Sequence, residues 1–181
     1  KGPDPIENLQ SQNINLLINL SASPFSYSKQ TLRKKLATKA AKRLHCPLIY
    51  LNQTGGNDEL IFDGGSFVLN ANADLVLELP SCKEIIEIWD ASSSNLQTLE
   101  QSQNPQEDLF KALILGTQDY ASKCGFDKVL LGLSGGIDSA LVDVIASAAM
   151  GSNNVTAILM PSPWSSSGSI DDALSLSKRL K

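Results

Sequence analysis

The pattern of apolar residues over positions 1–90 predicts a strand-rich region with one long helix. Short apolar runs separated by turn residues are typical of strands, and they occur at residues 14–20, 47–53, 59–62, 66–70, 75–79 and 84–89. The run at 14–20 suits a buried strand, and residues 84–89 alternate isoleucine with acidic residues. Glycines at 54–58 and 63–65 predict two turns, and residues 5–12 predict a short helix or turn.

Residues 29–44 carry the clearest helical pattern of this region, because leucine and alanine recur there at one-turn spacing. The residues predicted to face inward are Leu32, Leu36, Ala40 and Leu44. The opposite face is basic throughout and holds Lys29, Arg33, Lys34, Lys35, Lys39, Lys42 and Arg43. A nucleic-acid surface is one interpretation, but the net charge of -4 and the lack of interleaved aromatic residues favour a solvated outer face.

Residues 105–181 alternate helix and strand patterns, which is typical of a parallel α/β sheet. A helix is predicted from Asn104-Pro105 to Gly125. A strand at 128–133 covered on both faces, a helix at 138–150 and a strand at 155–160 then predict a β-α-β unit with parallel strands. A cap at 169–172 predicts a last helix, whose inward residues are Ala173, Leu176 and Leu180.

Composition narrows the possible chemistry. The chain has 181 residues with 42% hydrophobic content, enough to bury a core, and its longest apolar runs are too short to span a membrane. Three cysteines without a C-x-x-C pair predict free thiols in a reducing compartment. His45 is the single histidine, which argues against a histidine-based triad or a histidine-rich metal site.

Residues 132–139, Gly-Leu-Ser-Gly-Gly-Ile-Asp-Ser, join the strand at 128–133 to the following helix. Gly135 and Gly136 allow positive φ and a close approach to a ligand, and the amides of 136–139 would lie at a helix N-terminus that favours phosphate. The loop has neither the lysine of a P-loop nor the glycine spacing of a dinucleotide fingerprint. Two interpretations remain: Asp138 reaches phosphate through Mg²⁺, or it is a first-turn acid in a tight turn.

Residues 134–139 resemble the SGGxDS loop of the ATP pyrophosphatases, which adenylate a substrate and let a nitrogen or sulfur nucleophile displace AMP. Three upstream segments, 19–25, 52–56 and 62–66, resemble the C-terminal part of a nitrilase-type (carbon-nitrogen hydrolase) amidase. The joined order of these parts, with Asp58-Glu59-Leu60 before Phe62 and with residues 160–173, is similar to the glutamine-dependent NAD synthetases.

That resemblance implies an α/β fold: the C-terminal part of a nitrilase-like α-β-β-α sandwich, followed by the start of a doubly wound parallel α/β domain of the adenine nucleotide α-hydrolase type. The implied boundaries are residues 1–90 for the amidase part, 91–104 for a Ser, Gln and Asn rich linker, and 105–181 for the synthetase part. The chain is then expected to be an internal fragment of a longer enzyme.

The resemblance also implies site residues. The ATP-binding residues would be Gly132, Leu133, Ser134, Gly135, Gly136, Ile137, Asp138 and Ser139, with Asp138 also a Mg²⁺ ligand. Backbone at 158–160 would flank adenine, and the loop at 165–169 would close over the nucleotide. Ser23 and Lys29 would contact glutamine. No catalytic residue is expected within the chain, because the amidase Glu, Lys and nucleophilic Cys would precede residue 1.

The implied activity is a ligase reaction of NAD biosynthesis: ATP, deamido-NAD and ammonia from glutamine give NAD, AMP and pyrophosphate. The parent would be a cytoplasmic homo-oligomer that acts on small molecules, without nucleic acid or membrane partners. Two alternatives stay open. One is another glutamine-fed ATP pyrophosphatase that makes a different amide, and the other is a catalytically inert nucleotide-binding module.

Overall fold

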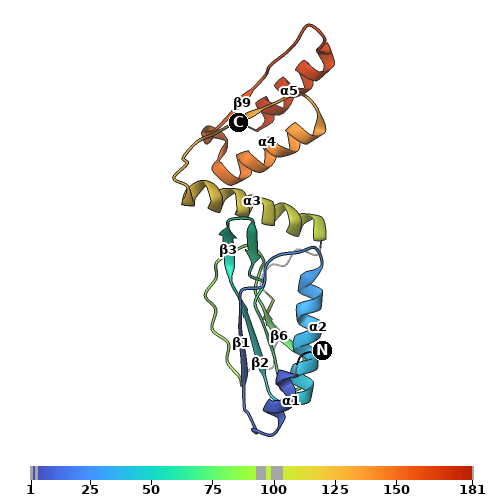
Figure 1. The fold of residues 1–181 in the computed structure, drawn as a ribbon, viewed down its shortest axis with the longest axis vertical. Coiled ribbons are helices and arrows are strands. Elements are labelled where there is room, and N and C mark those ends of the chain that lie inside the picture. Colours follow the sequence, from blue (N-terminus) through green and yellow to red (C-terminus); the bar gives the residue numbers. More distant parts are fainter. Residues whose placement is uncertain (1, 3, 93–96, 99–103, 181) are drawn as a thin grey trace. The chain divides into compact units, whose positions relative to one another are not determined.

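The computed structural model describes residues 2, 4–92, 97–98 and 104–180 (Figure 1). The chain is a mixed α/β protein, as predicted, and it divides into two compact units. One unit comprises residues 1–55 and 60–112, and the other comprises residues 56–59 and 113–181. Among the described residues, no helix combines the length and apolar character needed to cross a membrane.

The first unit is built on a five-stranded mixed sheet with the order β1-β2-β5-β6-β7. β1 and β2 run parallel, β5 is antiparallel to both of its neighbours, and β7 runs parallel to β6. The strands of this sheet are β1 (Leu17–Ser21), β2 (Leu48–Asn52), β5 (Phe67–Leu69), β6 (Leu75–Glu78) and β7 (Gln97–Thr98). A separate hairpin pairs β3 (Thr54–Asn57) with β4 (Leu60–Asp63), and two helices, α1 (Pro5–Gln10) and α2 (Lys29–Leu44), complete the elements.

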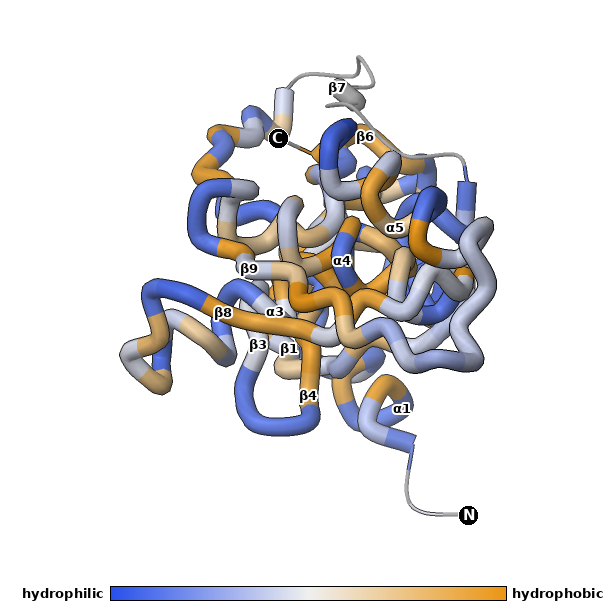
Figure 2. Tube along the Cα trace, turned by 90° about the horizontal axis from the view of Figure 1, so that it is seen from above, coloured by the Kyte–Doolittle hydropathy of each residue, from blue (hydrophilic) through white to orange (hydrophobic). Residues whose placement is uncertain are grey.

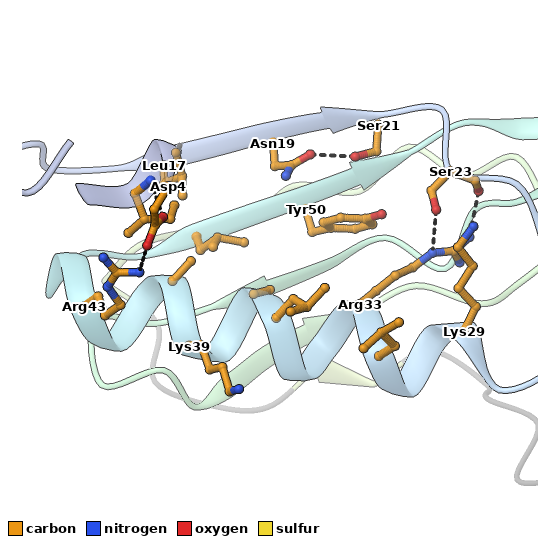
Figure 3. Close-up of a pocket in the computed structure, with 16 residues that line it drawn as sticks. Asp4, Leu17, Asn19, Ser21, Ser23, Lys29, Arg33, Lys39, Arg43 and Tyr50 are labelled. Atoms are coloured by element: carbon orange, nitrogen blue, oxygen red, sulfur yellow. Dashed lines mark hydrogen bonds and ion pairs between the residues drawn. The ribbon is translucent and has the colours of Figure 1, made fainter. Parts of the chain in front are cut away.

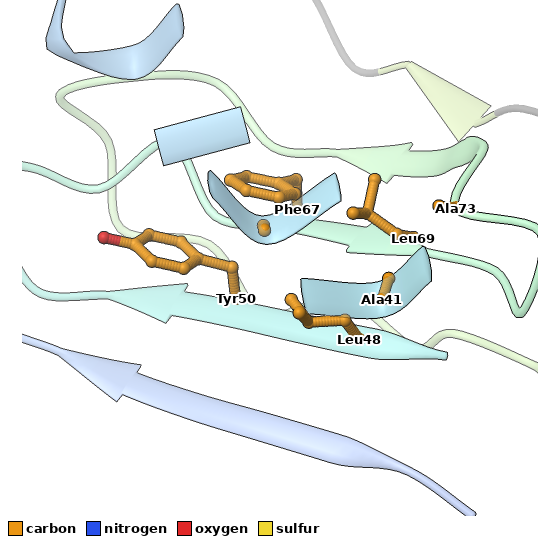
Figure 4. Close-up of a cluster of buried hydrophobic side chains, with 7 residues drawn as sticks. Ala41, Leu48, Tyr50, Phe67, Leu69 and Ala73 are labelled. Atoms are coloured by element: carbon orange, nitrogen blue, oxygen red, sulfur yellow. The ribbon is translucent and has the colours of Figure 1, made fainter. Parts of the chain in front are cut away.

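The core of the first unit lies between α2 and one face of the sheet (Figure 4). Small residues of α2, Ala37 and Ala41, let the helix approach β2 and β5 closely. Tyr50 and Phe67 are opposite each other in the β2–β5 ladder and their rings stack with centroids 5.0 Å apart. The cluster of Val68, Val76 and Leu77 packs on the other face.

The inward face of α2 differs from the predicted one. Leu32 and Leu36 are 52% and 57% exposed, whereas Arg33, Ala37 and Ala41 are buried. The stripe that packs on the sheet is therefore one residue further along the helix, a rotation of about 100°. The prediction was wrong for Leu32 and Leu36, whereas Ala40 packs against the core as predicted. It ranked apolar side chains only, while an arginine followed by two alanines at four-residue spacing fills this interface.

Two strand predictions in this unit also need correction. Of the run at 14–20, residues 17–20 belong to β1, and Ile18 and Leu20 are 53% and 78% exposed instead of buried because no described residue covers them. The run at 84–89 is not a strand, because it pairs with no strand of the described chain. The side chains of Ile86 and Ile88 are 98% and 84% exposed. Trp89 packs beside the second apolar cluster instead. The expected turn at 54–58 is the hairpin whose first strand is β3.

The predicted linker at 91–104 lies partly outside the described residues, since 93–96 and 99–103 are not described. Two of its residues, Gln97 and Thr98, form β7. α3 (Pro105–Lys123) follows, ends before Gly125 at φ +75 as predicted, and contains the boundary between the two units.

The second unit holds the predicted β-α-β arrangement. β8 (Val129–Gly132) and β9 (Val155–Ile158) pair in parallel, and α4 (Ile137–Met150), the 3₁₀ turn η1 (Ser152–Asn154) and α5 (Ser167–Arg179) complete it. β8 is apolar along its length (Figure 2), but Leu130 is 72% exposed because burial alternates along the strand. The expectation of cover on both faces is therefore wrong for the described chain. α5 begins earlier than predicted, at a cap formed by Ser166, and Ala173 faces inward as expected.

Candidate functional site

The loop from Ser134 to Ser139 connects β8 to α4 and is held by its own serines. The Ser139 hydroxyl accepts from the Ser134 amide at 3.1 Å, donates to the Gly136 carbonyl at 3.0 Å and lies 2.9 Å from the Ser134 hydroxyl. The Gly136 amide donates to Ser134 Oγ at 3.3 Å. These hydrogen bonds within the loop help to define its shape.

The N-terminus of α4 is open. Gly136 is the N-cap, offers no side chain to the first turn, and accepts the Ala140 amide at 3.1 Å. In the part of the chain that the structure describes, no acceptor takes the amides of Ile137, Asp138 or Ser139. Three unpaired N–H groups at the positive end of a helix dipole form a site that suits an anion.

Asp138 projects from this open turn as an exposed side chain. No described residue makes a hydrogen bond or ion pair with its carboxylate, and the described chain holds no group of three acidic, histidine or cysteine side chains that could bind a metal. A lone carboxylate beside an anion site repels a bare phosphate, but it fits a phosphate that is accompanied by a divalent cation. Asp138 is the carboxylate that the loop could offer to such an ion.

Gly135 lets the loop lie against the first turn of α5. Its φ is +83, and a Cβ atom there would lie 2.1 Å from the backbone oxygen of Ser169. The Ser166 hydroxyl caps α5 by accepting the Ser169 amide at 3.1 Å. The segment expected to close over a nucleotide, 165–169, is thus adjacent to the phosphate loop and largely helical.

The carboxyl end of β9 lies beside the start of the loop. Gly132 is paired with Ile158 in the β8–β9 register, and the Leu133 amide donates to the Ile158 carbonyl at 2.9 Å. The fold thus brings the predicted adenine-flanking backbone at 158–160 next to the predicted phosphate loop. This edge of a parallel sheet is where ligands bind in open α/β folds.

In the first unit, the predicted glutamine contacts Ser23 and Lys29 line one end of a cavity of about 540 Å³ between α2, β1 and β2 (Figure 3). Lys29 Nζ donates to the Pro24 carbonyl at 2.9 Å. The Ser23 amide donates to Asn52 Oδ1 at 2.9 Å, and Asn52 Nδ2 donates back to the Ser23 carbonyl at 3.1 Å. The structure brings both side chains to the same turn around Pro24.

Arg33 is the residue of this site that sequence reasoning missed. Its guanidinium contacts Ser23 (Figure 3). It also donates to the Pro24 carbonyl and makes a two-point ion pair with Asp63 at 2.8 and 2.9 Å. The side chains of Arg33 and Asp63 are only 4% and 7% exposed. No local signal in the sequence marked Arg33, because its partner Asp63 lies thirty residues later in the chain.

Three buried or half-buried titratable groups have raised pKa values. Burial, followed by the charges of Asp63 and Asp108, raises the pKa of Cys82 to about 12, and burial also raises the pKa of Cys46. The described cysteines are free thiols. In α4, burial raises the pKa of the Asp143 carboxyl. The raised pKa values of Cys46 and Cys82 are the opposite of what an activated thiol nucleophile needs.

Comparison with known proteins finds similarity to one group of enzymes. Residues 109–181 match the sequence model of a family described as NAD synthase. Over 98% of its length the chain is 50% identical to a glutamine-dependent NAD(+) synthetase of Synechocystis and 38% identical to one of Rhodobacter capsulatus. A solved structure of the glutamine-dependent NAD+ synthetase of Acinetobacter baumannii, in complex with ADP, matches 97% of the chain with a TM-score of 0.91 at 37% identity.

The matches confirm the resemblance to glutamine-dependent NAD synthetases that the sequence predicted. They also have a limited extent: the chain spans 33% of each of these two curated relatives and 34% of the solved chain. Both units lie within the matched region, since the alignments cover nearly the whole chain.

Proposed function

We propose that this chain is part of a glutamine-dependent NAD synthetase, a ligase that amidates deamido-NAD to NAD with ATP and with ammonia taken from glutamine. The observation that carries the proposal is the loop of residues 134–139. It presents three unpaired amides and the exposed Asp138 at the edge of a parallel sheet, within the region that matches the NAD synthase family.

In this proposal the second unit binds ATP. Gly132 to Ser139 hold the phosphates, with the amides of Ile137, Asp138 and Ser139 as donors. Asp138 would hold Mg²⁺, which when bound offsets the negative charge of the phosphates and of the departing pyrophosphate. Backbone at 158–160 would flank adenine, because this segment continues the β9 edge next to the loop.

The first unit would supply part of the glutamine site. Ser23 and Lys29 line the same end of a cavity, and an ammonium group at Lys29 suits the carboxylate of glutamine. Hydrolysis of the amide needs an activated nucleophile, and the raised pKa values of Cys46 and Cys82 do not suit that role. The resemblance matches Cys124 to no nucleophile position. The nucleophilic Cys and its Glu and Lys would come from elsewhere in the protein.

The finer architecture belongs to the same proposal. Residues 1–90 would be the C-terminal part of a nitrilase-like α-β-β-α sandwich, 91–104 a linker, and 105–181 the start of a doubly wound adenine nucleotide α-hydrolase-like domain. The whole protein would be a cytoplasmic homo-oligomer acting on small molecules, without nucleic-acid or membrane partners.

Transfer of nitrogen tests the proposal. The full-length protein is incubated with ATP, Mg²⁺, deamido-NAD and glutamine labelled with ¹⁵N at its amide, and the NAD formed is analysed by mass spectrometry. We expect ¹⁵N in the nicotinamide amide. ATP turnover with a different acceptor would favour another ATP pyrophosphatase, and ATP binding without any turnover would favour an inert nucleotide-binding module.

A further inference from the structure

The turn between β1 and α2 determines where the two proposed glutamine contacts lie. Ser23 and Lys29 are both half-buried, and each is tied to the backbone of this turn. Neither belongs to a rigid strand: Ser23 follows β1, and Lys29 is the first residue of α2. Something must therefore hold the turn in place if these side chains are to meet a ligand in a fixed geometry.

Arg33 provides that hold from the second turn of α2. Its Nη2 donates to the Ser23 carbonyl at 2.6 Å and to the Pro24 carbonyl at 3.2 Å, and its Nε donates to Ser23 Oγ at 3.2 Å. The planar guanidinium thus contacts the backbone and the side chain of the turn at the same time (Figure 3). A lysine in this position has three donors on a single nitrogen and lacks the planar fork that reaches the backbone and the side chain of the turn together.

The guanidinium is itself fixed from the opposite side. Asp63, at the end of β4, accepts from both Nη atoms, and Gln30 Oε1 accepts from Nη1 at 3.2 Å. Gln30 is held in turn, because its Nε2 donates to the Gly65 carbonyl at 2.6 Å. All donors of Arg33 are occupied and its side chain is 4% exposed, so it cannot rotate to another partner without leaving a buried charge unpaired.

The direction of one hydrogen bond matters for function. Because Arg33 Nε can only donate, Ser23 Oγ accepts in that contact, and the hydroxyl proton remains available. No residue of the described chain accepts that proton, and Ser23 lines the cavity. A serine held in this way is a donor toward a ligand oxygen, either a carboxylate or an amide carbonyl.

We propose that Arg33, backed by Asp63, is a positioning residue of the glutamine site: it fixes Ser23 as a hydrogen-bond donor to an oxygen of the substrate. This inference rests on the proposed function. Arg33 does not touch the substrate itself and acts through Ser23. The expected consequence of losing it is weaker use of glutamine with little change in the synthetase reaction supplied with free ammonia.

The test compares Arg33→Lys, Ser23→Ala and the double variant in the full-length enzyme. The KM for glutamine, kcat with glutamine and the rate with ammonium chloride are measured for each. We expect each single change to raise the KM about tenfold or more, because a ligand hydrogen bond is lost or misdirected. The double variant should be no worse than Ser23→Ala alone, since Arg33 acts through that hydroxyl.

A matched control lies on the same helix. Arg43 also pairs with an aspartate, Asp4, but in an exposed contact at the far end of the cavity. Arg43→Lys should leave the KM for glutamine unchanged. If Arg33→Lys fails to fold, the pair Arg33→Met with Asp63→Leu removes both buried charges together and still removes the contact to Ser23.

The outcomes separate the two levels of the proposal. A wild-type enzyme that makes no NAD from glutamine or ammonia would refute the proposed function. If the wild type is active, two results would assign Arg33 a structural role and overturn the inference. One is a double variant whose KM for glutamine rises by the product of the two single increases. The other is an equal loss of the glutamine and ammonia reactions in Arg33→Lys. An unchanged KM in Arg33→Lys would overturn it as well.

Discussion

Replacing Gly135 by alanine should damage the phosphate loop far more than replacing its neighbour Gly136. Gly135 has φ +83, and a Cβ there would lie 2.1 Å from the Ser169 oxygen and 2.7 and 2.8 Å from the Ser169 carbonyl carbon and Cα. All three atoms belong to backbone, so no side-chain rotation relieves the overlap. Gly136 has φ -84, and its Cβ would meet only Ser134 Oγ at an ordinary 3.4 Å.

The magnitude follows from two costs. A non-glycine residue in the left-handed conformation costs about 1–2 kcal/mol, and forcing an extra methyl group into a packed contact costs about 1–3 kcal/mol. Gly135→Ala should therefore lower the local stability of the loop and α4 by about 2–5 kcal/mol. Gly136→Ala should cost about 1 kcal/mol or less, because only the preference for glycine at an N-cap is lost.

Amide hydrogen exchange of α4, followed by mass spectrometry, measures this local stability without requiring the whole protein to unfold in one step. A loss of 2–5 kcal/mol corresponds to exchange that is faster by about 30-fold to several thousandfold. The relief of the overlap should also move α5 away from the loop and weaken the binding of Mg-ATP. Equal exchange rates in the two alanine variants would refute the close contact between Gly135 and α5.

Three further predictions concern other side chains. Asp138→Asn should lower Mg-ATP affinity about tenfold or more in calorimetry and leave binding of ATP without Mg²⁺ nearly unchanged; equal Mg-ATP affinity would remove Asp138 from a metal role. Burial raises the pKa of Asp143 above its ordinary 3.8, so its ionised form destabilises the fold as pH rises through the folded-state pKa. Asp143→Asn should therefore raise the melting temperature at pH 7, with a gain that shrinks toward pH 4, and a gain independent of pH would contradict this. With its pKa raised to about 12, Cys82 should react with iodoacetamide at pH 8 much more slowly than the exposed Cys124, and similar rates would argue against its buried, acid-flanked setting.

Local sequence signals predicted the second unit well. The strand, glycine loop and helix around residues 132–139 are each specified by neighbouring residues: a short apolar run, glycines at the turn and Gly151 after the helix. The parallel pairing of β8 with β9 follows from the helix between them. Such features depend little on the rest of the molecule, so the candidate phosphate site could be located from the sequence.

Features that depend on tertiary contacts were not predictable in the same way. The pattern of leucines in α2 indicates Leu32 and Leu36 as inward, yet the helix turns Arg33 to the sheet because Asp63, thirty residues later, pairs with it there. The apolar run at 84–89 resembles a strand, but a strand requires a neighbour that pairs with it, and no described strand pairs with this run. Whether a face is buried depends on what covers it.

The contact between Ser23 and Arg33 shows the same limit for the glutamine site. Resemblance pointed to Ser23 and Lys29, but neither spacing nor composition indicated which residue fixes the turn between them. Only the fold brings α2, the end of β4 and the turn after β1 together.

Release of pyrophosphate by the full-length protein is the most direct test of the synthetase assignment. The assay supplies Mg-ATP alone, then with deamido-NAD, and then with deamido-NAD and glutamine. The account predicts sustained release only when both co-substrates are present, with one NAD formed for each pyrophosphate. Release that does not depend on deamido-NAD, or no release in any mixture, would contradict it.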